Sequence, residues 1–124
     1  MDKNVSNITI QKRTEDFAIR VIKAYAEINK RCHFNNAVSI ISKQFLRSGT
    51  SIGANISEAV YAQSNKDFIH KYSISLKEAS ETKYWIKIMI QAQIVPKNKF
   101  SPMLNEIEQI IKILVAIIKK LKAK

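Results

Sequence analysis

Small side chains inside a helical pattern constrain the fold of this chain more than any other feature of its sequence. Residues 45–59 keep apolar side chains at helical spacing, yet Gly49, Gly53 and Ser57 recur along one face. A glycine within a helix costs about 0.5–1 kcal/mol relative to alanine, so the repeat indicates that another helix packs closely against this face.

The helix that follows in the sequence is the expected neighbour. Ser64 precedes Asp67 by one helical turn, which is typical of a helix N-terminus that follows a short link. In the resulting antiparallel hairpin, facing residues have numbers that add up to about 127, which places small residues opposite small residues. The helices can then approach more closely than the usual 8–10 Å between axes. The residues expected in this contact are Gly49, Gly53, Ser57, Ser75 and Ala79.

The same hairpin register predicts a structural ion pair. It places Arg47 beside Glu78 and Glu81 on the next helix. Desolvation offsets much of the attraction in a partly buried pair, so we expect this pair to fix the register of the hairpin more than it adds stability.

The whole chain predicts an all-α fold, an antiparallel up-and-down four-helix bundle that forms one domain over residues 1–124. Only two glycines and two prolines occur in 124 residues, which favours long helices joined by few turns. The expected helices cover about residues 14–31, a segment that includes residues 45–59, about residues 66–93, and a last segment that begins at Ser101 and Pro102.

Two parts of the chain depart from this helical pattern. Residues 1–11 lack helical periodicity and are expected to form a flexible arm. A break in the second helix at residues 48–51 remains an alternative, because turn-type residues cluster there while the apolar period continues in phase on both sides.

Three segments carry a resemblance to a known family. They are RSGTSIGANISEA at residues 47–59, DFIHK at residues 67–71 and KEASETKYW at residues 77–85. Together they resemble the four-helix-bundle proteins encoded within intervening sequences of bacterial 23S ribosomal RNA genes. The chain is also similar to the accessory variability protein of diversity-generating retroelements. That second resemblance implies a basic, ring-shaped homo-oligomer, often a pentamer, that binds nucleic acid and a reverse transcriptase.

The net charge of +11 is the main functional clue, because so basic a small protein attracts nucleic acid through its phosphates. No zinc-finger spacing, RNA-recognition-motif signature or GXXG loop occurs, so we expect contacts to phosphate and shape rather than to bases. The alternative is a solvated basic surface supported by helical ion pairs. The candidate nucleic-acid-binding residues are Lys12, Arg13, Arg20, Lys23, Lys30, Arg31, Lys112, Lys119, Lys120, Lys122 and Lys124.

Apolar residues outside the core stripe of the third helix predict self-association. Ile74, Trp85 and Ile88 lie about 110° around the helix from the residues expected in the core. A monomer would leave this apolar face exposed, and such a face is usually an interaction site. We therefore expect these three residues to form an oligomer interface.

The sequence contains no set of residues that indicates catalysis, a metal or a cofactor. Asp67 and His70 form one acid-x-x-histidine pair, but a di-metal bundle requires more ligands, and His33 lies too far away in the expected topology to be presumed a partner. The single cysteine, Cys32, is expected in the core and is compatible with a reducing cytoplasm. No apolar run reaches the length of a membrane span, so a cytoplasmic location is expected.

These observations lead to two functional hypotheses. The first is a non-enzymatic, homo-oligomeric bundle that binds structured RNA or DNA through its phosphates, as an accessory to a nucleic-acid enzyme. The second is a protein–protein scaffold whose charge serves mainly solubility. They differ in salt dependence, because a phosphate binder loses affinity steeply as the salt concentration rises.

Overall fold

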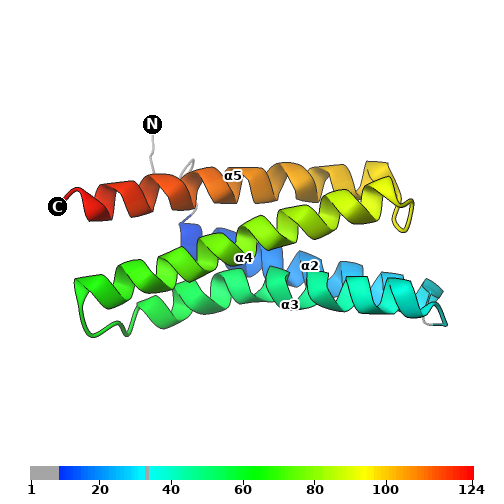
Figure 1. Ribbon diagram of the computed structural model, residues 1–124, viewed down its shortest axis with the longest axis horizontal. Helices are drawn as coiled ribbons and strands as arrows, with labels where there is room; N and C mark the ends of the chain where they lie inside the picture. Colours follow the sequence, from blue (N-terminus) through cyan, green and yellow to red (C-terminus); the bar gives the residue numbers. More distant parts are fainter. Residues whose placement is uncertain (1–8, 33) are drawn as a thin grey trace.

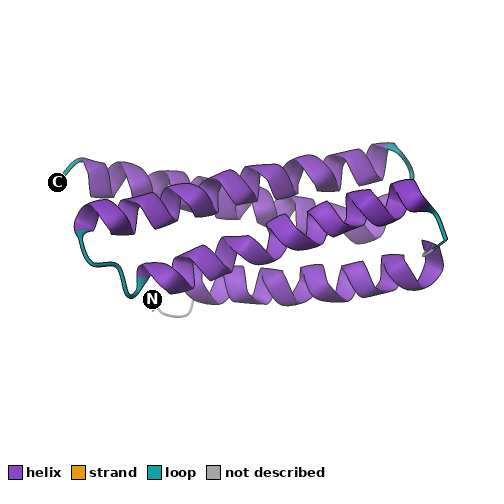
Figure 2. Ribbon diagram, turned by 60° about the horizontal axis from the view of Figure 1, so that its bottom comes forward, coloured by secondary structure: helices purple, strands orange, loops and turns teal. Residues whose placement is uncertain are grey.

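Four long antiparallel helices form an up-and-down bundle in the computed structural model, which describes residues 9–32 and 34–124 (Figure 1). The helices are α2 (Ile10–Cys32), α3 (Asn36–Ala59), α4 (Asn65–Gln91) and α5 (Lys97–Lys122). Short loops join them end to end, and no strand occurs in the described ranges (Figure 2). The predicted four-helix bundle is therefore confirmed.

One apolar core runs along the axis of the bundle and receives side chains from every helix. Its fully buried members include Phe17, Phe45, Ile86 and Leu114. Helix α3 packs extensively on α2 and α4, and α4 packs on α5. Of the neighbouring helices in the bundle, α2 and α5 contact each other least. The bundle is therefore less tightly closed between its first and last helices.

The glycines of α3 do pack against a neighbouring helix, but that helix is α2 and not α4. A Cβ atom built on Gly49 would lie 2.8 Å from a methyl carbon of Val21, and one built on Gly53 would lie 3.3 Å from the backbone of Thr14. The expectation that both glycines face Ser75 and Ala79 is therefore wrong.

The close contact between α3 and α4 uses the adjacent strip of α3. The Ser75 hydroxyl donates to the backbone carbonyl of Ile52 at 2.8 Å, and the Thr82 hydroxyl donates to the Ser48 hydroxyl at 2.9 Å. Ala79 is also fully buried. At 100° per residue, Ser48 lies about 100° around the helix from Gly49 and about 140° from Gly53. Small residues of α3 therefore face α2 on one side and α4 on the other.

Ser57 does not take part in the helix packing predicted for it. Its side chain is exposed and lines a shallow hollow on the surface between α2 and α3. The helical repeat of small residues therefore extends one turn beyond the contact that requires it.

Helix α3 is continuous, so the alternative of a break at residues 48–51 is excluded. Thr50 donates a hydrogen bond to the Leu46 carbonyl at 2.8 Å, and Ser51 donates to the Arg47 carbonyl at 2.6 Å. These hydroxyls bond to the carbonyls of the preceding turn and need no turn in the backbone.

Two helices begin earlier than their sequence signals indicate. Helix α2 begins at Ile10, where the Thr9 hydroxyl accepts from the Lys12 amide at 3.1 Å. Residues 10 and 11 are therefore helical; the rest of the predicted arm lies outside the described residues, apart from Thr9.

Helix α5 begins at Lys97 rather than at Ser101, and Pro102 lies inside it. Phe100 is 6% exposed and packs against Phe45 with ring centroids 6.2 Å apart. Burial of this ring holds the first turn of α5 on the core, which outweighs the hydrogen bond that Pro102 cannot donate. The serine–proline signal therefore marks the second turn of the helix.

The hairpin register places Arg47 where the sequence predicts it. Its guanidinium donates to Glu78 at 3.2 Å and to Glu81 at 2.6 Å. Glu81 also accepts from the Trp85 indole nitrogen at 3.0 Å. The hydrogen bond from Trp85, and to a lesser degree the one from Arg47, lowers the pKa of Glu81 below its usual value. The predicted ion pair is present, while its effect on the register stays a prediction.

No helix in the described ranges combines the length and apolarity that a bilayer span requires.

We predict that Gly49→Ala destabilises the protein by about 1–2 kcal/mol, because overpacking against the stiff side chain of Val21 outweighs the gain in helix propensity. In a Val21→Ala background the same substitution should be neutral or stabilising, since the clashing methyls are gone. Chemical denaturation of the four proteins in this double-mutant cycle measures the effect. Equal effects of Gly49→Ala in both backgrounds would contradict the close α2–α3 contact.

Candidate nucleic-acid interface

Most acidic side chains of the described residues are already paired with cations. They form ion pairs along single helices and between helices, which leaves the remaining positive charge without compensation. The paired carboxylates are those of Glu15, Asp16, Glu27, Glu58, Glu78, Glu81, Glu106 and Glu108.

Three of the candidate nucleic-acid-binding residues belong to these ion pairs. Lys12 contacts Asp16 at 3.1 Å, and Arg31 contacts Glu27 at 3.0 Å, both within α2. The hydrogen bond to Asp16 raises the pKa of Lys12. Such exposed pairs one turn apart support the helix and leave the cation accessible to solvent.

Arg13 has a structural role that the sequence did not indicate. Its guanidinium donates two hydrogen bonds to Glu106 on α5, at 3.0 Å and 2.7 Å. Both side chains are about three-quarters buried, with exposures of 27% and 24%. Donation of these hydrogen bonds to Glu106 raises the pKa of Arg13. This bidentate pair connects the two neighbouring helices that have the fewest other contacts with each other.

The other candidate cations are exposed and make no ion pair within the described part of the chain. Helix α2 contributes Arg20, Lys23 and Lys30, and the second group lies along α5 and just after it. We call this second group the α5 cation cluster, and it consists of Lys112, Lys119, Lys120, Lys122 and Lys124.

The α5 cation cluster extends beyond the start of α2. Arg13 lies one turn into α2, and its partner Glu106 is followed by more than four further turns of α5. In Figure 1 the last turns of α5, drawn in red, continue well past the blue start of α2. Lys112 and Lys119 lie roughly 150° around α5 from the buried Leu114, so they face solvent.

The antiparallel topology adds a cation that the sequence analysis missed. The beginning of α4 lies at the same end of the bundle as the end of α5, as both ribbon views show. Lys66, in the first turn of α4, is exposed there and forms no ion pair with any residue that the structure describes. Only the order of the helices, and no local motif, could have grouped it with the α5 cation cluster.

The opposite end of the bundle holds a second, smaller basic group. Lys30 and Arg31 end α2, and Lys97 and Lys99 begin α5 at the same end (Figure 1). The predicted residues therefore do not form one surface. Arg20 and Lys23 lie between the two ends of α2.

The apolar residues predicted as an oligomer interface are less exposed than the sequence indicates. Ile74, Trp85 and Ile88 are all half-buried, and Trp85 packs partly against the core. Helix α4 has neighbours on both sides, so the covered arc is wider than the core stripe alone. Tyr84, which is 55% exposed, lines a surface hollow together with Ile88.

Other exposed apolar side chains lie on different helices and loops. They are Ile19, Ile22, Phe34, Ile40, Val60 and Tyr61.

The residues considered for catalysis or metal binding do not gather. His70 is exposed at a shallow hollow shared with Asp67, and Asp67 accepts a hydrogen bond from the backbone amide of Gln63. His33 lies outside the described residues. Across residues 9–32 and 34–124, no three or more histidine, cysteine, aspartate or glutamate side chains are placed to hold a metal ion.

Comparison with known proteins identifies the family of this chain. The family model of the 23S rRNA-intervening sequence protein matches residues 6–116, which is most of the chain. The chain belongs to the 23S rRNA-intervening sequence protein family. The resemblance carried by residues 47–59, 67–71 and 77–85 is thus confirmed.

A solved structure supports the same assignment of this 23S rRNA-intervening sequence protein. The chain is similar to a Bacteroides thetaiotaomicron protein of unknown function from the S23 ribosomal protein family. The two are 40% identical, the match covers 90% of this chain and 99% of that chain, and the TM-score is 0.81. No curated protein matches the chain.

We predict that Arg13→Gln lowers the free energy of unfolding by about 1 kcal/mol, because it removes a bidentate pair and leaves Glu106 unpaired. Arg20→Gln is the matched control. Arg20 also lies on α2 but is exposed and forms no ion pair among residues 9–32 and 34–124, so its substitution should change stability by less than about 0.5 kcal/mol. Urea denaturation compares the two variants, and equal effects would contradict the structural role of Arg13.

Proposed function

We propose that this 23S rRNA-intervening sequence protein is a non-enzymatic protein that binds structured RNA or DNA through phosphate contacts. The observation that carries the proposal is the α5 cation cluster, which projects beyond α2 with no acidic partner in the described residues. Lysine clusters of this kind attract phosphates, and their binding releases the counterions that surround the nucleic acid.

The geometry favours recognition of the backbone over recognition of bases. The cluster consists of exposed lysines on α5 and just after it, and lysine acts as a point charge on a flexible stem. Contacts between these lysines and phosphates would give affinity without sequence preference. Lys66 at the start of α4 widens the same basic end and would contact a neighbouring phosphate.

Self-association is the second part of the proposal. We propose a homo-oligomer, with a pentamer as the expected size, in which each basic end would be repeated around the ring. Ile88 and the exposed Tyr84 beside it on α4 are the strongest support for an interface at Ile74, Trp85 and Ile88. The exposed pair Ile19 and Ile22 on α2 offers an alternative surface.

The partner and the location also belong to the proposal. A basic oligomer that binds nucleic acid suits an accessory role beside a nucleic-acid enzyme such as a reverse transcriptase, in the cytoplasm. The competing function is a protein–protein scaffold that does not bind nucleic acid, and the exposed apolar side chains on several helices favour it.

We predict that affinity for a short DNA duplex falls steeply with salt, with a logarithmic slope that grows by about 0.9 per neutralised phosphate. Replacing Lys119, Lys120 and Lys122 with glutamate should abolish binding without unfolding the bundle, since all three are exposed. Fluorescence anisotropy at several salt concentrations, with circular dichroism as the folding check, measures both effects.

A charge-matched control separates this site from net charge. Lys43, Lys77 and Lys87 are exposed on α3 and α4, and their replacement with glutamate changes the net charge equally. This control should retain most of the binding. Equal loss in both triple variants would contradict a site on α5, and no binding by the unmodified protein at physiological salt would favour the scaffold.

A further inference from the structure

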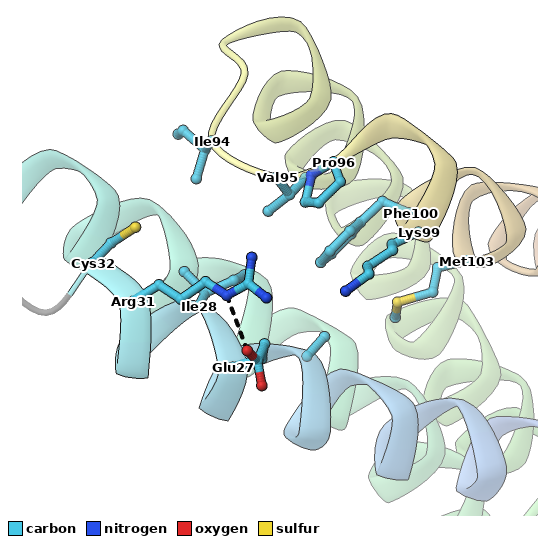
Figure 3. Close-up of a pocket in the computed structure, with 11 residues that line it drawn as sticks. Glu27, Ile28, Arg31, Cys32, Ile94, Val95, Pro96, Lys99, Phe100 and Met103 are labelled. Carbon is cyan, nitrogen blue, oxygen red and sulfur yellow. Dashed lines mark hydrogen bonds and ion pairs between the residues drawn. The ribbon is translucent and has the colours of Figure 1, made fainter.

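An apolar cavity lies where α2 ends and α5 begins (Figure 3). Its volume is about 190 Å³. The apolar residues that line it include Ala24, Ile28, Ile94, Val95, Phe100 and Met103. It lies at the far end of the bundle from the α5 cation cluster, so it is separate from the proposed nucleic-acid site.

The cavity is a consequence of the loose contact between α2 and α5. Ile28 and Phe100 are each 6% exposed, whereas Ile52 and Ile107 in the middle of the core have no exposed surface. The Arg13–Glu106 pair connects the two helices well away from this end. The apolar walls are therefore reachable from the surface.

Two cations point into the space at the mouth of the cavity. Figure 3 shows the guanidinium of Arg31 and the amino group of Lys99 directed toward it from α2 and α5. Glu27 accepts a hydrogen bond from Nε of Arg31 at 3.0 Å, and neither terminal nitrogen of that guanidinium is paired with a residue in the described part of the chain. The Lys99 amino group forms no ion pair or hydrogen bond with the described residues.

We infer that this cavity binds a small amphiphilic anion, with its apolar ring or short alkyl chain inside and its carboxylate or phosphate at Arg31 and Lys99. An apolar cavity of about 150 Å³ is enough to hold benzene, so the available volume suits a group of that size. Burial of the apolar group would supply affinity, and the guanidinium and ammonium donors match an anionic head group. One carboxylate against two cations makes the mouth electropositive.

Octanoate, octyl phosphate and neutral octanol are suitable probes because they share one chain length and differ in the head group. Cys32 lines the cavity and is the only cysteine in the chain, so its alkylation by iodoacetamide reports occupancy directly. We expect octanoate or octyl phosphate to slow alkylation of Cys32 and to shift the methyl NMR signals of Ile28, Ile94 and Val95. Octanol should bind about tenfold more weakly than the tighter anion. The tighter of the two anions identifies the head group.

Two lysines in the first turn of α5 provide a matched pair of variants. Lys99→Gln should weaken binding of the anion about tenfold and leave octanol unchanged, because Lys99 lines the cavity. Lys97→Gln should change neither affinity, because Lys97 is exposed on the same turn but does not line the cavity. Ala24→Phe, which fills the cavity, should abolish binding of all three probes.

Several outcomes would overturn the inference. One is the absence of both Cys32 protection and methyl shifts with either anion. Another is equal affinity for octanol and the anions, together with no effect of Lys99→Gln, which would mean an apolar void without recognition of charge. The Lys99→Gln comparison remains decisive even if Ala24→Phe fails to fold, because Lys99 is a surface residue.

Discussion

The close approach of α2 to α3 at two glycines determines how the rest of the bundle is arranged. A single added carbon at Gly49 would lie within 3 Å of both Val21 methyls, so this contact holds α2 against α3. Of its two neighbours, α2 correspondingly contacts α5 less than α3. The Arg13–Glu106 pair connects the first and last helices near the start of α2.

The functional surfaces lie at the two ends of that open side. Beyond the start of α2 at Ile10, α5 continues and presents the α5 cation cluster to solvent. At the other end, the incomplete contact leaves an apolar cavity beside Arg31 and Lys99. The excess positive charge has the same origin at both ends of the bundle, because most carboxylates of the described residues already form ion pairs within or between helices.

The sequence predicted the bundle and the hairpin register, because both depend on local signals. The Ser64 cap and the Arg47 ion pair follow from spacing within one hairpin. The pattern also predicted a close contact for the glycines but assigned it to the wrong helix. Helical periodicity gives the angle between a residue and the core stripe of its helix. A bundle helix has one neighbour on each side of that stripe, so this angle alone did not distinguish α2 from α4.

The remaining features depend on contacts between distant segments. Arg13 and Glu106 are separated by most of the chain, and no spacing rule connects them. The start of α5 at Lys97 depends on the burial of Phe100 against Phe45, which outweighs a strong serine–proline signal. Lys66 and Lys99 join basic groups only because the helices are antiparallel.

The solution mass of the protein, measured by light scattering with and without a structured RNA, tests the central claim most directly. We expect a mass near a whole-number multiple of 14.2 kDa, which for a pentamer is five times that value. Addition of RNA should increase the mass further, and this increase should disappear at high salt. A mass of 14.2 kDa that RNA does not change at low salt would contradict both the assembly and the nucleic-acid binding.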